Sequence, residues 1–449
     1  MRCYPPALVS TPPSAGSIRL ADVARSWWPL AASWMLMGIE LPLLSAVVAR
    51  LPNPEIHLAA YGGLVFPIAL LVEAPIIMML AASTTLSKHQ AAYDALGRTM
   101  HRLSALLTIL HVALAFTPLF DWVLVPLLDT PPQAVEPARL GLMIMTPWTW
   151  AIASRRFNQG VLIRLGRSGL VTRGSLVRLS AGGLVLVIGY SLGASGIVVA
   201  TATVIGGVLA EATYAALKTH PLVRHKLLPG DPKSVLRGRP FLRFYVPLAL
   251  TPLVALVVQP IGAAALARMP NAIESLALWP VVNGLLFLLQ SSGFAFNEVV
   301  ISTLDRPGAP AVLLRFALLL AAILSLVCLA FAATPIADLW FGELSGLRPK
   351  LVVLASAGLW CGVTIPGARA LASWYGGVLV HGGRTGALTE SVAVFLVLCS
   401  SLLAVGVYRG DHQGLIVGFF AYAVARIGET TWLWWRSRDL RAALALRHP

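Results

Sequence analysis

The stretch Ala49-Arg50-Leu51-Pro52-Asn53 occurs twice, with one substitution, returning as Ala267-Arg268-Met269-Pro270-Asn271. The offset of 218 residues (268 against 50) is close to half of the 449-residue chain, and matches at this offset continue on both sides of the pentapeptide. They include Pro29 with Pro247, Pro42 with Pro260, Thr85 with Thr303, Gly196 with Gly414 and Glu211 with Glu429. Leu and Ala coincide by chance in an apolar chain, but Arg, Pro, Asn, Gly and Glu at one offset do not. The sequence therefore consists of two related halves.

After a shift of one residue the repeat also covers the middle of each half. The segment Gly160-Val161-Leu162 matches Gly377-Val378-Leu379, and Gly166-Arg167 matches Gly383-Arg384. A repeat this long predicts that both halves have the same order of secondary-structure elements.

The composition predicts that these elements lie in a membrane. Hydrophobic residues make up 57% of the chain and charged residues only 12%, whereas soluble domains carry about 25% charged residues. Apolar stretches of about 20 residues, enough for a helix to cross a ~30 Å hydrocarbon core, recur along the whole length. The stretches are continuously apolar rather than alternating, which favours helices over a β-barrel. We expect spans near residues 26–49, 56–86, 99–120, 139–163, 174–193, 195–217, 241–267, 273–302, 311–333, 350–380, 386–407 and 413–436.

The predicted fold is thus an all-α integral membrane protein of about twelve transmembrane helices, arranged as two six-helix repeats. Because six is even, both halves start on the same side, so the repeat is parallel and its pseudo-two-fold axis runs along the membrane normal. The expected organisation is an N-terminal tail, an N-lobe, a basic linker, a C-lobe and a C-terminal tail, at residues 1–25, 26–217, 218–240, 241–436 and 437–449.

The basic charge predicts the orientation. The chain carries 34 Lys and Arg residues and a net charge of +15. Between the predicted spans, most of these residues lie on the side of both termini. The opposite side has only Arg50, Arg139, Arg268, Arg348, Lys350 and Arg409. This bias follows the positive-inside rule and predicts cytoplasmic termini in a cell (inner) membrane. The distribution of the basic residues indicates anionic lipid headgroups rather than nucleic acid as their partner. The first 25 residues lack the pattern of a removed signal peptide.

No pattern of an enzyme is evident. The four cysteines (Cys3, Cys328, Cys361, Cys399) are scattered, and no set of His and Cys has the spacing of metal ligands. No Gly-rich phosphate loop and no catalytic Ser/His motif occurs. We therefore expect no catalytic residue, no metal site and no cofactor.

The chain resembles the MATE-like MOP flippase superfamily. The resemblance rests on the two parallel six-helix halves and on the Gly-rich basic joints at 160–167 and 377–384. The openings of the halves, Trp27-Trp28-Pro29-Leu30 and Tyr245-Val246-Pro247-Leu248, and the later Gly428-Glu429-Thr430-Thr431 look most like the progressive ankylosis (ANK) branch. The superfamily implies gradient-driven export by alternating access, and the ANK branch implies small organic anions such as citrate, nucleotides or pyrophosphate.

Four arginines inside predicted spans are candidates for binding an anion. Charges at membrane depth are costly and usually functional, and the guanidinium fork suits carboxylate and phosphate. We expect Arg155, Arg156, Arg369 and Arg426 to contact substrate, with Asn158, Asn283 and Gln290 as neutral partners. Structural explanations remain open: adjacent Arg155 and Arg156 point about 100° apart on a helix, and Arg426 could neutralise Glu429 one turn away.

Four acidic residues are candidates for ion coupling. Glu40 and Glu73 have no acidic counterpart in the other half, so either could be a proton or Na⁺ site. Glu211 and Glu429 occupy equivalent positions, which favours an architectural role at least as strongly. For Glu40 and Glu73, an internal hydrogen bond or ion pair is the structural alternative.

The leading hypothesis is a monomeric secondary active exporter of small organic anions that alternates access between two lobes. Its expected partners are the lipid bilayer, a small anionic substrate and, for coupling, a proton or Na⁺. A proton- or Na⁺-coupled multidrug antiporter and a lipid-linked sugar flippase are the transporter alternatives. A membrane scaffold without transport is the alternative of a different class.

Overall fold

The first half is a bundle of helices, the longest of which run from one end of the bundle to the other. The computed structural model describes residues 18–231, 235–236 and 238–447; most of the predicted N-terminal tail (residues 1–17) lies outside them. The elements of the first half are α1 (Leu20–Gly38), α2 (Glu40–Val48), α3 (Pro54–Ala60), η1 (Tyr61–Val65), α4 (Phe66–Ile77), α5 (Met79–Leu86), α6 (Gln90–Phe116), η2 (Phe120–Leu124), α7 (Val125–Leu128), α8 (Pro132–Ile144), α9 (Trp148–Arg164), α10 (Ser168–Ser191) and α11 (Gly196–Lys226).

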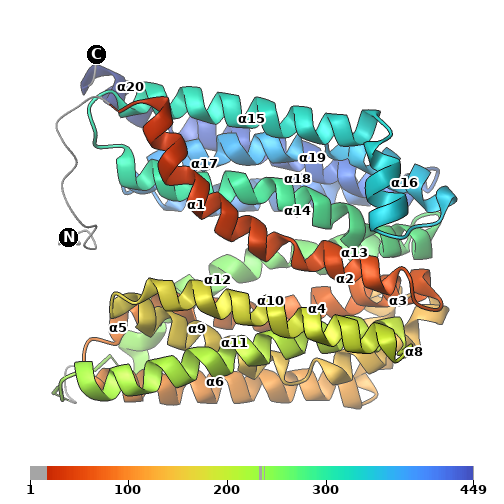
Figure 1. The fold of residues 1–449 in the computed structure, drawn as a ribbon, viewed down its shortest axis with the longest axis horizontal. Helices are drawn as coiled ribbons and strands as arrows, with labels where there is room; N and C mark the ends of the chain where they lie inside the picture. Colours follow the sequence, from red (N-terminus) through yellow and green to blue (C-terminus); the bar gives the residue numbers. More distant parts are fainter. Residues whose placement is uncertain (1–17, 232–234, 237, 448–449) are drawn as a thin grey trace.

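The second half repeats this order with fewer interruptions (Figure 1). Its elements are α12 (Gly238–Leu256), α13 (Val258–Ala267), α14 (Ala272–Thr303), α15 (Ala309–Ala333), η4 (Asp338–Leu344), α16 (Pro349–Gly362), α17 (Ile365–His381), α18 (Gly386–Arg409), α19 (Gly414–Arg436) and α20 (Arg438–Arg447). No strand occurs among the described residues, as expected for a chain that must satisfy its backbone hydrogen bonds within lipid.

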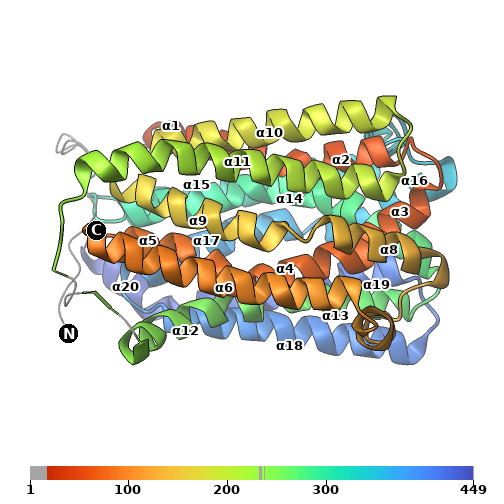
Figure 2. The same ribbon diagram turned by 90° about the horizontal axis from the view of Figure 1, so that it is seen from below.

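Ten helical segments in the described chain are long and apolar enough to cross a membrane. Two more segments, α8–α9 and α19, lie alongside them in the bundle but are more polar because they carry buried charges (Figure 2). The structure thus confirms the predicted all-helical membrane fold, and the twelve crossing segments are consistent with two sets of six.

Helix breaks occur at equivalent positions in the two halves. The first span breaks at Ile39, between α1 and α2, and the seventh breaks at Val257, between α12 and α13. Both positions fit the 218-residue offset. Asn53 and Asn271, also equivalent, both adopt the left-handed conformation, with φ of 52° and 56°, before the next helix. Asparagine is among the few residues that adopt it at low cost.

The opening helix of each half packs on the other half. α1 packs mainly against α14, and α12 packs against α4. The Trp27 indole nitrogen donates to the Ser292 carbonyl at 2.9 Å, and the Tyr245 hydroxyl donates to the Pro75 carbonyl at 2.7 Å. The two halves therefore exchange a helix, and Figure 1 shows α1 lying across the second half.

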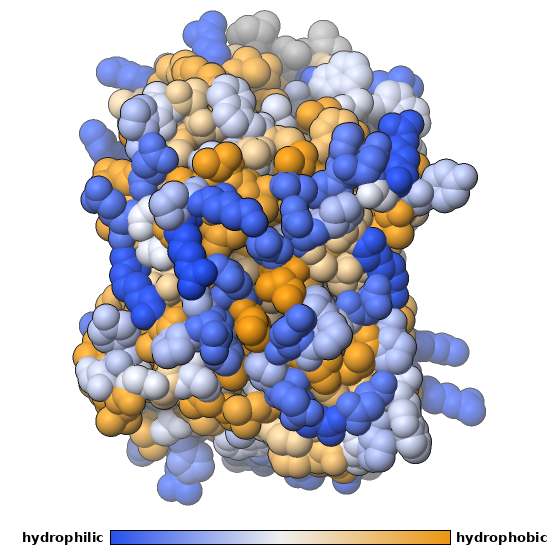
Figure 3. All heavy atoms as spheres, turned by 90° about the vertical axis from the view of Figure 1, so that its right-hand side faces the viewer, coloured by the Kyte–Doolittle hydropathy of each residue, from blue (hydrophilic) through white to orange (hydrophobic). Residues whose placement is uncertain are grey.

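The ends of the bundle differ in charge and in contact between the halves. The basic end, where α1 begins and α20 ends, carries the connections α5–α6, α9–α10, α14–α15 and α17–α18. Figure 3 looks onto the opposite end, where hydrophilic side chains cover much of the surface. There α3 of the first half packs against α14 of the second. A cavity of about 20 Å³ between the halves leaves room for little more than one water molecule.

Two equivalent arginines join the halves at this opposite end. Arg50 of the first half donates to the Leu344 carbonyl at 3.0 Å and also to the Glu343 carbonyl. Arg268 of the second half donates to the carbonyls of Pro126 and Leu127, at 3.2 and 3.1 Å. The acceptors correspond to each other under the shifted repeat. We call these contacts the arginine latch.

Several element boundaries differ from those expected from the sequence. α11 continues to Lys226 and α12 begins at Gly238, so the helices extend into the predicted linker at 218–240. Most of the predicted C-terminal tail is the helix α20, whose Leu440 packs against Gly382. α10 begins at Ser168, six residues before the predicted start at 174. This last difference matters for the buried charges, because Arg178 lies ten residues after the observed start of the helix rather than four residues after the predicted one.

Candidate functional site

A closed polar network joins α9, α10 and α11 in the first half. Arg155 Nη1 lies 2.7 Å from Glu211 Oε2, and the two side chains are only 6% and 1% exposed. Glu211 Oε1 also accepts from Gln159 Nε2 at 3.0 Å and from the Ser175 hydroxyl at 3.4 Å. Arg155, predicted to contact substrate, and Glu211, predicted as an ion-coupling candidate, therefore bind each other.

A second ion pair joins α2 to α10, between Glu40 and Arg178. The Arg178 guanidinium donates through both Nε and Nη2 to the Glu40 carboxylate, and both side chains are mostly buried. The sequence analysis did not identify Arg178 as a buried charge, because the predicted helix began too late and left it close to the connecting segment. The signal that could have found it is Glu40, a buried carboxylate that needs a partner.

Glu73 and Arg156 lie near these pairs without joining either. Glu73, on α4, is 5% exposed, and its Oε2 atom has no hydrogen-bond partner among the described residues. Arg156, on α9, is half-buried, and no ion pair of the described chain includes it; its buried Nε has no partner either. The two side chains are within electrostatic range of each other. The first half thus holds one carboxylate and one guanidinium that are near each other but unbonded.

Within its spans, the described part of the second half has one buried ion pair and one half-buried arginine without a carboxylate partner. On α19, Arg426 binds Glu429 one turn away, and it also donates to the Tyr422 hydroxyl at 3.0 Å. The neutralisation of Arg426 by Glu429, predicted as one alternative from their spacing, is what the structure shows. Arg369, on α17, is half-buried with no carboxylate partner among the described residues, and its Nε is unsatisfied.

Aromatic contacts place Arg369 close to the helix that the first half contributes. Its guanidinium lies over the Phe294 ring, with 4.7 Å between Cζ and the ring centroid. Phe294 in turn stacks on Trp34 of α1, with 5.3 Å between centroids. Arg369 therefore lies near the contact between α14 and α1, which is a boundary between the two halves.

The three predicted neutral contacts are mostly occupied locally. Asn158 donates to the Ser154 carbonyl at 2.8 Å, and Gln290 donates to the Leu286 carbonyl at 3.2 Å, both within their own helices. Asn283 is half-buried on α14, and no hydrogen bond of its side chain occurs among the described residues. The structure therefore does not bring these amides together with the arginines into one set of contacts.

The buried charges balance in the first half but not in the second. Among the described residues, the first half sets Glu40, Glu73 and Glu211 against Arg155, Arg156 and Arg178, whereas the second half sets only Glu429 against Arg369 and Arg426. A guanidinium buried without a counter-ion is costly. A bound anion would remove this cost at Arg369, and a proton or small cation could be exchanged at Glu73.

Sequence comparison assigns no family, since no protein family model and no curated protein matches this chain. Solved structures do match, at probability 1.00. An inward-facing multidrug resistance MATE family transporter of the MOP superfamily has a TM-score of 0.70 at 14% identity, over 93% of this chain and 98% of that one. The lipid II flippase MurJ, in an inward closed conformation, has a TM-score of 0.67 at 13% identity, over 94% and 90% of the two chains.

A third match is a MOP superfamily transporter from Pyrococcus furiosus, described as having a binding pocket of reverse polarity. Its TM-score is 0.58 at 15% identity, over 96% of this chain and 97% of that one. An outward-facing MATE structure gives a lower TM-score, 0.55, than the inward-facing one. These neighbours are transporters and flippases rather than enzymes. The chain therefore has the fold seen in the MATE-like transporters of the MOP superfamily.

Proposed function

We propose that this protein is a secondary active transporter that exports small organic anions, of the citrate, nucleotide or pyrophosphate kind, by alternating access between its halves. The observation that carries the proposal is a pair of partly buried arginines, Arg156 in the first half and Arg369 in the second, that form no ion pair with any described carboxylate. Arginine stays charged at any physiological pH, and its forked donors match carboxylate and phosphate oxygens. An anion bound to Arg369 supplies the counter-charge that no described residue provides there, and Arg156 offers a second guanidinium that no described carboxylate contacts directly.

The basic end of the bundle supports the direction of transport. Under the positive-inside rule this end lies in the cytoplasm, which places both termini there. Its positive potential raises the local concentration of anions. The closed arginine latch at the opposite end fits a state that receives substrate from the cytoplasm. We further propose that the chain works as a monomer, with the halves at residues 26–217 and 241–436 as its moving lobes, and that the ANK branch is its nearest relative within the superfamily.

Transport assays in proteoliposomes test this proposal. We expect efflux of labelled citrate, ATP or pyrophosphate, reduced at least tenfold by Arg156→Gln or Arg369→Gln. Arg173→Gln is a matched control, because Arg173 is exposed on α10 and no ion pair of the described residues involves it. Absence of transport for all three anions, or equal rates in Arg369→Gln, Arg156→Gln and the wild type, would refute the proposal.

A proton- or Na⁺-coupled antiporter of cationic drugs is the second candidate, and Glu73 favours it. Its carboxylate is buried with an unsatisfied oxygen, as expected of a group that takes up and releases a cation. In that case Glu73→Gln abolishes drug resistance conferred by expression, while Arg369→Gln retains it. Glu40→Gln then serves as a comparison, because Glu40 is already held by Arg178.

A further inference from the structure

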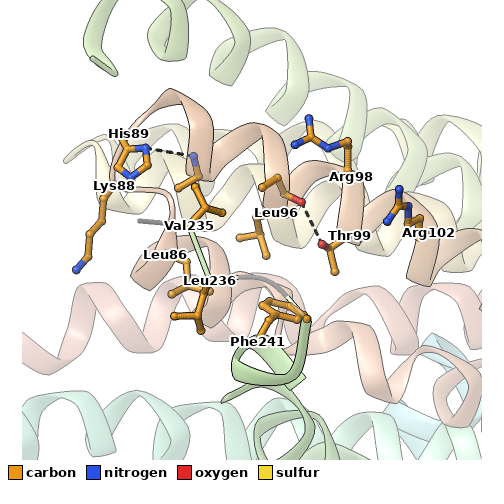
Figure 4. A pocket seen from close by; sticks show the side chains of 13 residues that line it. Leu86, Lys88, His89, Leu96, Arg98, Thr99, Arg102, Val235, Leu236 and Phe241 are labelled. Atoms are coloured by element: carbon orange, nitrogen blue, oxygen red, sulfur yellow. Dashed lines mark hydrogen bonds between the residues drawn. The ribbon is translucent and has the colours of Figure 1, made fainter. Parts of the chain in front are cut away.

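A cavity of about 380 Å³ lies at the basic end, between the start of α6 and the start of α12 (Figure 4). Its walls come from α5, from one face of α6, from residues 235–236 of the connection between the halves, and from the first turn of α12. The cavity is separate from the buried ion pairs described above and is lined by none of their residues.

The connection between the halves is fixed to the start of α6 close to this cavity. The Gln90 amide nitrogen donates to the Leu228 carbonyl at 2.9 Å. Gly230 lies against the His89 ring so closely that a Cβ atom at this glycine would be 2.1 Å from it. The walls of the cavity thus belong to one packed corner that involves the connection and both halves.

The polar lining of the cavity carries positive charge. Lys88, Arg98 and Arg102 line it, and no acidic side chain does among the described residues. In the part of the chain that the structure describes, none of these three side chains takes part in an ion pair or a hydrogen bond. The Thr99 hydroxyl already donates to the Ala95 carbonyl at 3.0 Å, so Lys88, Arg98 and Arg102 are the cationic donors at this site, beside the His89 ring that also lines it.

The position of the cavity along α6 is where the lipid headgroups are expected. Large apolar side chains of α6 become exposed from Leu106 onward, with Ile109 and Leu110 in the next turn. Arg102 lies one turn before Leu106, and Arg98 lies two turns before it. The arginines therefore lie where the hydrocarbon layer ends and lipid phosphates begin.

We infer that this cavity binds a phosphate group, held by Lys88, Arg98 and Arg102 next to the start of α12. Two guanidinium forks and an ammonium supply enough donors for the oxygens of a phosphate monoester or diester. Because α12 opens the second half yet packs on the first, a ligand at its start holds this exchanged helix in place. The source of the phosphate is either an anionic lipid or a soluble phosphate compound, and the inference does not depend on the transported substrate.

Binding measurements on the purified full-length protein distinguish the two sources. One arm titrates pyrophosphate into protein in detergent by calorimetry. The other compares thermal unfolding in nanodiscs of phosphatidylcholine with and without phosphatidylglycerol. The test variant is Arg98→Gln/Arg102→Gln. The control is Arg167→Gln/Arg173→Gln, which removes the same charge from exposed positions at the same end, at the start of α10.

Either source leads to a defined result. A soluble ligand gives saturable pyrophosphate binding that falls at least tenfold in the test variant and stays unchanged in the control. A lipid headgroup gives stabilisation by phosphatidylglycerol that the test variant loses and the control keeps. The inference is overturned if neither arm shows binding, or if both variants lose it equally, since this would indicate only a general effect of net charge.

Discussion

Replacing Arg50 and Arg268 together by alanine should open the end of the bundle opposite the termini. Both guanidiniums bind backbone carbonyls of the other half, and each also donates to a carbonyl one turn back in its own helix, at 2.7 Å. This second bond holds the side chain in place before it reaches across. The latch therefore stabilises the closed end without a large entropic cost.

The expected magnitude follows from the number of contacts between the halves. The two latch arginines make four hydrogen bonds across the boundary, two each. Bonds from charged donors are worth about 1.5–3 kcal/mol when buried, but these side chains are exposed, so we take about 0.5–1 kcal/mol each. The total of about 2–4 kcal/mol corresponds to a shift of at least about 30-fold toward the open end. Each single variant should give about half of this free energy.

The reactivity of a cysteine introduced at a buried position measures whether this end of the bundle has opened. Ala277, 1% exposed, lines the small cavity between the halves below the latch. In a background without the native cysteines, Ala277→Cys should react slowly with a membrane-impermeant maleimide, and at least tenfold faster in Arg50→Ala/Arg268→Ala. Arg409→Ala, at the same end but without a contact to the other half among the described residues, is the control. Unchanged labelling in the double variant, or an equal increase in the control, would refute the latch.

Three further predictions concern single residues. Gly346→Ala should mimic Arg50→Ala in the labelling assay, because Gly346 has a φ of +71° and its Cβ would be 2.9 Å from Arg50 Nη1; Gly342→Ala, where the nearest atom is 3.8 Å away, should not. Glu211→Gln should lower stability by about 3–5 kcal/mol because it leaves Arg155 buried without a carboxylate; thermal unfolding in detergent measures this, and exposed Glu136→Gln should change little. Gly160→Ala should force α9 away from α5, since its Cβ would be 2.3 Å from the Leu80 carbonyl, and should lower the free energy of unfolding by about 1–3 kcal/mol. Gly183→Ala, with no atom within 4 Å of its Cβ, should leave stability unchanged or raise it slightly. An equal loss of stability in both variants would contradict the packing argument.

The fold could be predicted from the sequence because each membrane-spanning helix is a continuous apolar stretch of the chain. Apolar length identified most spans, and the repeat indicated that the order of helices in one half recurs in the other. The exchange of α1 and α12 between the halves could not be predicted in this way. It depends on which surfaces meet over distances of more than 200 residues, and hydropathy carries no information about that.

The candidate site was predictable to the extent that its contacts are local. Arg426 and Glu429 are three residues apart, so helical geometry alone predicted that they could pair. The pairs Arg155–Glu211 and Glu40–Arg178 join different helices, so their partners could not be read from the spacing. Arg178 was missed for a further reason: polar residues in the first turns of α10 made the apolar span look shorter than the helix is.

If the protein transports as proposed, the repeat distinguishes the parts that move from the parts that bind substrate. Rocking of two halves about a common axis requires the same hinge and the same closing contact on both sides. The breaks at Ile39 and Val257 and the latch arginines Arg50 and Arg268 are equivalent in this way. A small anion can bind to one half alone, so the groups that bind it need not repeat. Arg369 has no charged counterpart in the first half, because the shifted repeat places it opposite Ile152. Arg369 is a charge that the repeat does not duplicate, and it is therefore the first residue to test for contact with substrate.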